Sequence, residues 1–432
     1  MEKLKQITLL LMLVVFALQA NAQTDSVYQF TLKQAQDFAI EHFFTSKNAK
    51  LDIEIAKKKI WETTAIGLPQ VSGSFDYQHI PNPPTMDFGG QEIKLALENS
   101  SSYGATVSQL VFSGEYIVGL QASKTYRTFA EENYEKVKID LLESVASNYF
   151  AVIIIRNNRK ILVETYENLL VNLDQMKKMF EQGFIEDTDL DQIDLVVKRT
   201  NNSILSVDRQ LEYLEKLFKY QLGLTSEDQV ELMQTMDELV LSHLVENTDY
   251  VFNLEENINY KLLVTNENLT DLSLKRQKST FLPSVNAFYQ YSDKTEKADF
   301  DISIKHVMGV SVSVPILSSG MRMAQVSQAK MELDKMKNMK EQQSEFLNYA
   351  AQQALFDYNS AKEQYNNEKE NFELSERVFK KTTIRFKEGV VSALDLSTVN
   401  NQFLQAQMTY SAAIQELLSK KIALDKAFNK LN

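Results

Sequence analysis

Apolar residues recur at alternating steps of three and four along three long stretches of the chain. The stretches start at Leu190, Leu347 and Leu396. In the last of them the positions are Leu396, Val399, Phe403, Ala406, Tyr410, Ala413 and Leu417. A sustained period of 3.5 residues is typical of long helices that pack side by side. The pattern fits an antiparallel helical hairpin within a bundle as well as it fits a larger helical array.

Two shorter windows alternate with a period of two. Apolar and polar residues alternate from Val310 to Ile316, from Ser284 to Tyr291 and from Val71 to Tyr77, with a weaker partner over 103–112. Strands of about ten residues, apolar on one side and polar on the other, are what a membrane barrel requires. A soluble hairpin with one face on a core has the same period. The alternation therefore predicts strands without saying what they face.

Glycine and proline mark the limits of these windows. Of the 12 glycines and 6 prolines, 11 lie between Gly67 and Gly119 and four more between Pro283 and Gly320. The other three are Gly183, Gly223 and Gly389. Met321–Glu388 contains neither residue, and Glu115–Gln182 contains only Gly119. Each of these segments predicts a helix of about 100 Å, at 1.5 Å per residue.

The same order of predicted helices and strands occurs twice along the chain. Phe180, Gly183 and Asp189 recur as Phe386, Gly389 and Asp395 at an offset of 206 residues, and Leu68-Pro69 recurs as Leu282-Pro283 at an offset of 214. Matches that recur in register over most of each half indicate a structural duplication. We expect a first repeat over 23–225 with a β-hairpin at about 70–113. A linker and a second repeat follow over 226–432, with a hairpin at about 284–317.

The N-terminus carries the pattern of a secretory signal peptide over residues 1–22. Lys3 and Lys5 precede an apolar run, Ile7–Leu18, and Ala20-Asn-Ala22 supplies small residues before Gln23. The run is too short for a membrane anchor, which needs about 20 residues. No later apolar stretch reaches 18 residues. The sequence therefore predicts an exported chain without a transmembrane helix, and export makes the membrane-barrel interpretation of the strands the better one.

Bulk composition excludes several kinds of chemistry. The net charge is −12 with both signs mixed along the chain, so no basic face predicts nucleic-acid binding. Without cysteine there is no disulfide framework and no thiolate metal site. The four histidines have no metal-binding spacing, and no phosphate-binding glycine motif is present. We therefore expect no enzyme activity, no cofactor and no metal.

Four strands are too few to close a membrane barrel, and open sheet edges are not tolerated in lipid. If the strands span a membrane, several chains must share one barrel. Three copies would give 12 strands, continued by a tube of helices.

In these features the chain resembles the outer-membrane efflux proteins of the TolC type. The resemblance rests on the duplication, on the two Leu-Pro steps, on 314–320 leading into a long helix, and on the turns after Phe180 and Phe386. It implies a mainly α-helical homotrimer, in which an α-helical barrel continues into a 12-stranded transmembrane β-barrel with four strands from each chain. It also implies contact with outer-membrane lipid, a location in the outer membrane reaching into the periplasm, docking to a periplasmic adaptor and an inner-membrane RND or ABC transporter, and passive conduction of substrates.

The resemblance further implies that the turns at Gly183 and Gly389 form the periplasmic aperture. Acids that line such an aperture correspond to Asp189 and Asp395, with Thr188 beside the first. A ring of carboxylates at a constriction favours cations. The same residues also fit helix capping, in the pairs Ser392 with Asp395 and Thr188 with Asp191. The two roles are compatible.

Members of this family often close the second turn with a tyrosine and an arginine. Here the corresponding residues are Phe386 and Val391. We hypothesise a latch made by charges instead, in which Arg385 or Lys387 pairs with Glu186 or Asp187.

Two other classes compete with the duct. One is a periplasmic coiled-coil scaffold or adhesin stalk without pore activity, and the other is an exported enzyme, which lacks a catalytic constellation. Within the duct interpretation, the sequence does not separate drug efflux from type I protein secretion.

Overall fold

The computed structural model describes residues 27–244, 250–297, 301 and 303–431, and the chain divides into two compact units. The helical unit comprises Met1–Lys47, Lys138–Phe252 and Ala351–Asn432, and the strand unit comprises Asn48–Val137 and Asn253–Ala350. Both units draw on both sequence repeats. The predicted signal peptide, residues 1–22, lies outside the described residues.

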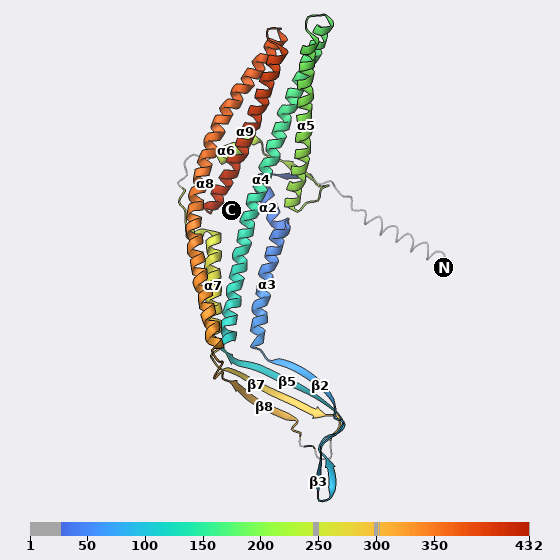
Figure 1. The fold of residues 1–432 in the computed structure, drawn as a ribbon, viewed down its shortest axis with the longest axis vertical. Helices are drawn as coiled ribbons and strands as arrows, with labels where there is room; N and C mark the ends of the chain where they lie inside the picture. Colours follow the sequence, from blue (N-terminus) through green and yellow to red (C-terminus); the bar gives the residue numbers. More distant parts are fainter. Residues whose placement is uncertain (1–26, 245–249, 298–300, 302, 432) are drawn as a thin grey trace, which may run out of the picture. The chain divides into compact units, whose positions relative to one another are not determined.

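Two helical hairpins dominate the helical unit (Figure 1). The first joins α4 (Gly114–Glu181) to α5 (Asp187–Leu222), and the second joins α8 (Met321–Lys387) to α9 (Ala393–Ala427). However, α4 up to Val137 and α8 up to Ala350 belong to the strand unit. The two long helices are confirmed to within one residue at each end. Among the helices that the structure describes, none combines the length and the apolar character needed to cross a membrane.

The main core of the helical unit gathers around the most apolar stretch of α4. Val145, Tyr149 and Phe150 are fully buried there, and α9 supplies Ile414 and Leu417. Each such side chain contributes about 1.5–3 kcal/mol through its removal from water. The apolar residues of α9 therefore pack mainly against other segments of the helical unit.

The two hairpins are held by different contacts. On α8, aromatic residues stand at every seventh position from Tyr358 through Phe379, so they share one side of the helix. Phe379 stacks on Phe403 of α9 with the ring planes 1° apart and the centroids at 5.0 Å. Between α4 and α5, an ion pair joins Arg156 to Glu215 at 2.6 Å. Both hairpins also bury apolar side chains, among them Leu169 of α4 and Ile193 of α5 in the first.

The helical unit also contains smaller elements, of which the two short strands and helix α6 were not predicted. Strands β1 (Val27–Phe30) and β6 (Gln229–Leu232) pair in parallel, and helices α2 (Leu32–His42) and α6 (Met236–His243) each begin with a capping box. The hydroxyl of Tyr149 donates to the carbonyl of Phe30 at 3.1 Å. This bond ties β1 to the main core.

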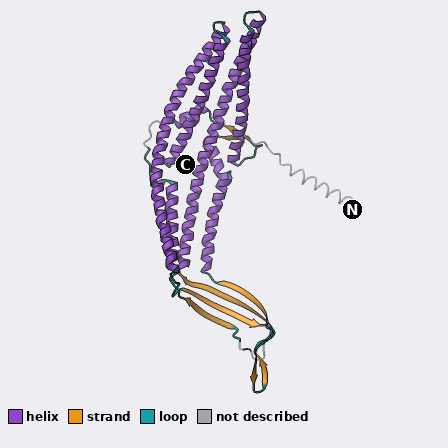
Figure 2. Ribbon diagram, in the orientation of Figure 1, coloured by secondary structure: helices purple, strands orange, loops and turns teal. Residues whose placement is uncertain are grey.

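In the strand unit, four long strands form one antiparallel sheet (Figure 2). The strands are β2 (Gln70–His79), β5 (Asn99–Ser113), β7 (Ser284–Lys294) and β8 (His306–Ser313). Their order across the sheet is β2-β5-β7-β8. The same unit contains the short helix η1 (Leu254–Glu256), helix α7 (Ile258–Ser279) and most of helix α3 (Phe44–Ile66). The second hairpin was expected to reach residue 317 but ends at Ser313. Pro315 lacks the N–H that a continued ladder would need.

The register gives this sheet one apolar and one polar face. Val71, Val107, Tyr289 and Met308 project from the first face, since each lies directly opposite the next across the strands. The side chains of β2 are exposed along the whole strand. On the second face the residues of β2 are Gln70, Ser72, Ser74, Asp76 and Gln78. The alternation predicted from the sequence is confirmed, and within the described residues neither β2 nor β8 has a partner at its outer edge.

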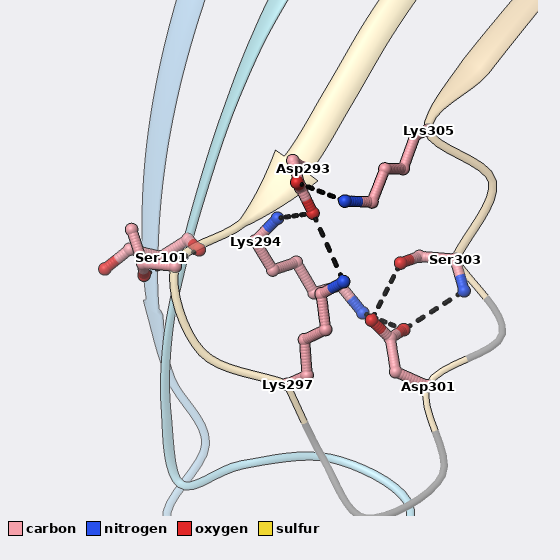
Figure 3. Close-up of polar contacts among 8 residues, drawn as sticks. Ser101, Asp293, Lys294, Lys297, Asp301, Ser303 and Lys305 are labelled. Atoms are coloured by element: carbon pink, nitrogen blue, oxygen red, sulfur yellow. Dashed lines mark hydrogen bonds and ion pairs between the residues drawn. The ribbon is translucent and has the colours of Figure 1, made fainter.

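Local contacts occur in the described parts of both connections at the far end of the sheet. The first contains a small hairpin, β3 (Thr85–Phe88) with β4 (Gln91–Lys94), which the sequence patterns did not predict. In the second, Asp293 pairs with Lys305 at 2.8 Å, and Asp301 pairs with Lys294 at 3.2 Å (Figure 3).

Candidate functional site at the two helical turns

The turns that end α4 and α8 have the same backbone structure. Gly183 and Gly389 adopt φ angles of 74° and 73°, in the left-handed region that glycine enters without a steric cost. The N–H of each glycine donates to a carbonyl three residues earlier, and the next N–H donates to one five residues earlier. Both helices therefore stop at their glycines, as the duplication predicts.

The helices that leave the turns begin differently. Ser392 caps α9, because its hydroxyl accepts from the N–H of Asp395 at 3.1 Å and the Asp395 carboxylate accepts from the Ser392 N–H at 3.0 Å. At the start of α5 the equivalent cap is Glu186, whose side chain makes no capping bond. The expected Ser392–Asp395 box is confirmed. The Thr188–Asp191 box is wrong, because α5 begins at Asp187 and Thr188 already lies inside its first turn.

A cavity of about 430 Å³ opens between the two turns. Asp189 reaches it from the first turn, and Lys387 and Gly389 reach it from the second. The remaining lining residues are Gln175, Met176, Lys178, Met179, Phe184, Ile185, Phe386, Val391, Ser392 and Ala393. Neither Asp395 nor Thr188 lines the cavity. Of the two predicted aperture acids, the structure therefore brings only Asp189 to it.

The residues of the predicted latch are all exposed, and none of them is paired within the described chain. Arg385 and Lys387 lie at the end of α8, and Glu186 and Asp187 lie at the start of α5. No ion pair of the described residues joins the two sets. The charge of Arg385 acts instead on Asp395, where it adds to a lowering of the pKa.

Exposed apolar residues at the turns were not predicted from the sequence. Phe184 is 73% exposed and Val390 is 59% exposed, and each directly follows its glycine. Leu394, in the first turn of α9, is 60% exposed. The sequence could have indicated these residues, because Phe184 and Val390 are separated by the same 206 positions as the two glycines. Together they give both turns an apolar surface around the cavity.

Acid is expected to loosen the start of α9 only below pH 4. The Ser392 hydroxyl and N–H, together with Arg385, hold the pKa of Asp395 below its ordinary value of 3.8. A carboxylate with a lowered pKa stabilises the fold at any pH above its unfolded value, and this contribution disappears as the pH falls through the folded pKa. Hydrogen exchange at residues 393–397, corrected for intrinsic rates, should be unchanged from pH 7 to pH 5 and faster below 3.8.

The matched variant is Ser392→Ala, which removes the hydroxyl and keeps the carboxylate. We expect it to cost about 1 kcal/mol of helix stability at pH 7 and to abolish most of the acid step. An acid step of the same size in the variant would contradict the assignment to the capping box.

Comparison with known proteins agrees with this architecture. The sequence model of the outer membrane efflux protein family matches residues 46–215 and 270–430. No curated protein sequence matches the chain. Among solved structures, the Campylobacter jejuni CmeC outer membrane channel is similar with a TM-score of 0.77 at 16% identity, over 92% of this chain and 85% of that one.

Two further structures are similar over nearly the whole chain. The outer membrane protein VceC from Vibrio cholerae gives a TM-score of 0.71 at 12% identity, covering 92% of this chain and 95% of its own. The open state of the Neisseria gonorrhoeae MtrE outer membrane channel gives 0.66 at 15% identity, covering 93% and 89%. At such identities the likeness concerns the fold.

Because the family model covers most of the chain, the protein belongs to the outer membrane efflux protein family. The resemblance drawn from the sequence is thereby confirmed. The chain is an exit duct of an efflux system, located in the outer membrane and extending into the periplasm. Its family is one of channels and not of enzymes.

Proposed function

We propose that three copies of this chain close one 12-stranded barrel in the outer membrane and one tube of helices in the periplasm, through which substrates leave passively. The observation that carries the proposal is the four-stranded sheet of the strand unit. It has one apolar face, one polar face and, within the described residues, two free edges, β2 and β8. A membrane barrel needs the apolar face outside, the polar face inside and no edge left open.

Closure by identical copies uses the two edges as a head-to-tail pair. Because β2 runs antiparallel to β5 and β8 antiparallel to β7, β8 of one copy is antiparallel to β2 of the next. Such heterologous contacts form a ring when the rotation closes. Three copies then supply 12 strands, within the range of single-channel outer-membrane barrels.

Apolar stripes on the helices support the same assembly. On α3, Phe44, Leu51 and Ile55 are about 60% exposed at steps of seven and four. On α8, Phe346 and Phe356 are 60% and 67% exposed. In a single chain these side chains face water, whereas steps of this kind are the pattern with which helices pack against neighbours. Neighbouring copies would cover both stripes.

We further propose that the cavity between the turns belongs to the periplasmic aperture of this duct. Asp189 supplies negative charge inside the cavity and Asp395 supplies it nearby, so the ring favours cations. The latch of Arg385 or Lys387 with Glu186 or Asp187 stays a prediction, and in the trimer it would join neighbouring copies. The exposed Phe184 and Val390 offer a surface to a periplasmic adaptor, which would link the duct to an inner-membrane RND or ABC transporter.

The proposal is tested by fractionation and planar-bilayer recording of the purified protein. We expect it in the outer membrane, as a trimer that forms discrete conducting channels. A protein that fractionates as soluble, without trimers and without conductance, would favour the periplasmic scaffold instead.

The aperture is tested in the same recordings with Asp189→Asn and Asp395→Asn. Removal of the negative ring is expected to lower the cation preference of the channel, with the larger change for Asp189, because its side chain lines the cavity. Arg385→Ala should raise single-channel conductance if Arg385 belongs to a latch. Unchanged conductance in Arg385→Ala would remove the latch, and unchanged selectivity in both acid variants would remove the aperture.

A further inference from the structure

Each free edge of the four-stranded sheet carries a histidine at the end away from the helices. His79 is the last residue of β2, and His306 is the first residue of β8. Both side chains are exposed. In a single chain they stand on opposite edges of the sheet.

The register places both histidines on the apolar face. Gly73, Ala105, Tyr291 and His306 form one row across the four strands. His79 lies six residues beyond Gly73 on β2. Because side chains alternate with a period of two, an even separation keeps His79 on the face of Gly73, and therefore on the face of His306.

We propose that His306 of one copy and His79 of the next meet where β8 pairs with β2, and that together they bind a divalent transition-metal cation such as Zn²⁺. The proposal rests on the barrel of the proposed function. It concerns one pair of side chains at each seam between copies.

The strand ends indicate the displacement at that seam. The sheet is slanted, since the row through the start of β8 crosses β2 six residues short of its end. This offset of six residues accumulates over three inter-strand spacings, at about two residues for each. A wall whose strand ends stay level therefore displaces the next β2 by about six to eight residues, which brings His79 opposite His306 or diagonal to it. Six residues at about 3.3 Å, across four strands about 4.8 Å apart, correspond to a tilt of about 45°, as barrels of this kind have.

Other displacements leave the pair within reach. The displacement must be even, because an odd one would turn polar side chains of one copy toward the lipid. At four or eight residues His79 becomes the diagonal neighbour of His306, with the Cα atoms roughly 7–8 Å apart. Two imidazoles at that separation still reach a shared metal ion.

Each imidazole has its Nδ1 within hydrogen-bond distance of a neighbouring oxygen that can accept a proton. The Nδ1 of His79 lies 2.8 Å from Asn99 Oδ1, which accepts its proton. The Nδ1 of His306 lies 2.8 Å from the hydroxyl of Tyr289. When Nδ1–H is donated to such a partner, Nε2 carries the free lone pair, which is the usual arrangement around metal-bound histidine. Two imidazole nitrogens and solvent suit Zn²⁺ and similar borderline cations.

Nearby carboxylates do not complete a site within one chain. Asp293 lies on the same face, but it is paired with Lys305 at 2.8 Å and with Lys297 at 3.6 Å (Figure 3). Within the described residues of a single copy, no group of three or more candidate ligands gathers. Because His79 and His306 stand on opposite edges of the sheet, the second imidazole of the proposed pair comes from another copy.

The metal is tested by titrating ZnCl₂ into the purified detergent-solubilised trimer and measuring bound zinc by calorimetry. We expect one Zn²⁺ per chain, lost in His79→Ala and in His306→Ala, with no further loss in the double variant. Asn99→Ala keeps both ligands and should weaken binding about tenfold. His42→Gln is the control, because His42 lies on α2. Equal zinc binding by the wild type and the double variant would overturn the proposal.

A second experiment separates this site from the barrel itself. In the double variant His79→Cys, His306→Cys, oxidation should link neighbouring copies into a covalent trimer on denaturing gels. Crosslinked trimers from the double cysteine variant, together with no zinc binding by the wild type, would remove the metal site and leave the barrel intact. A protein without trimers would remove both.

Discussion

Val310→Arg is expected to abolish outer-membrane assembly of the channel. Val310 lies in the middle of β8, is 65% exposed and projects from the apolar face of the sheet. An arginine at the midplane of a membrane barrel costs about 2–4 kcal/mol, and each of the three proposed copies would bear that cost. The measurement is the amount of trimer in outer-membrane fractions, which should fall to less than about a tenth of the wild-type amount.

The neighbouring residue provides the control. Ser311 is also exposed on β8, but it projects from the polar face. Ser311→Arg adds the same side chain to the same strand, where water in the lumen solvates it. We expect near-normal trimer from Ser311→Arg and a changed ion selectivity. Equal losses in the two variants would contradict the assignment of the faces to lipid and lumen.

The second large effect is expected at the end of α5. Gly223 has a φ angle of 74°, and a Cβ added to it would lie 2.8 Å from the carbonyl oxygen of His42. This oxygen belongs to the backbone, so it cannot move aside as the end of a flexible side chain would. Gly223→Ala therefore adds steric overlap to the cost of a left-handed residue, together about 2–4 kcal/mol.

Gly183→Ala separates the two contributions. Gly183 has the same φ angle of 74°, but no atom lies within 4 Å of the position that a Cβ would occupy there. Only the left-handed backbone is then penalised, by about 1–2 kcal/mol. The apparent melting temperature of the trimer, measured at one scan rate, should fall at least twice as far for Gly223→Ala. Equal decreases would show that the contact with His42 relaxes freely.

Local rules were sufficient for most of the fold. The long helices follow from stretches without glycine or proline, and their ends follow from Gly183 and Gly389, because a left-handed residue ends a helix wherever it occurs. The strands follow from their period of two. The Ser392–Asp395 box could be read directly, since both partners lie within one helical turn.

Contacts between distant segments could not be read in this way. The parallel pairing of β1 with β6 joins residues about 200 positions apart, and each strand has only four residues, too few for a period to show. The Thr188–Asp191 prediction failed because the motif does not say which residue precedes the first helical one. The small hairpin β3–β4 was hidden by its short length, although Gly89-Gly90 marks its turn.

The features of the candidate site also divide into those that local sequence predicts and those that depend on distant contacts. The sequence alone determined that two equivalent turns exist and that each is followed by an acid, because the duplication repeats both features at one offset. Only the tertiary structure decided that Asp189 lines the cavity while Asp395 is held in its capping box. It also decided which edge of the sheet carries each histidine. The physical reason is that periodicity and capping depend on neighbours within a few residues, whereas a cavity or a strand register depends on packing between segments that the chain brings together only when it folds.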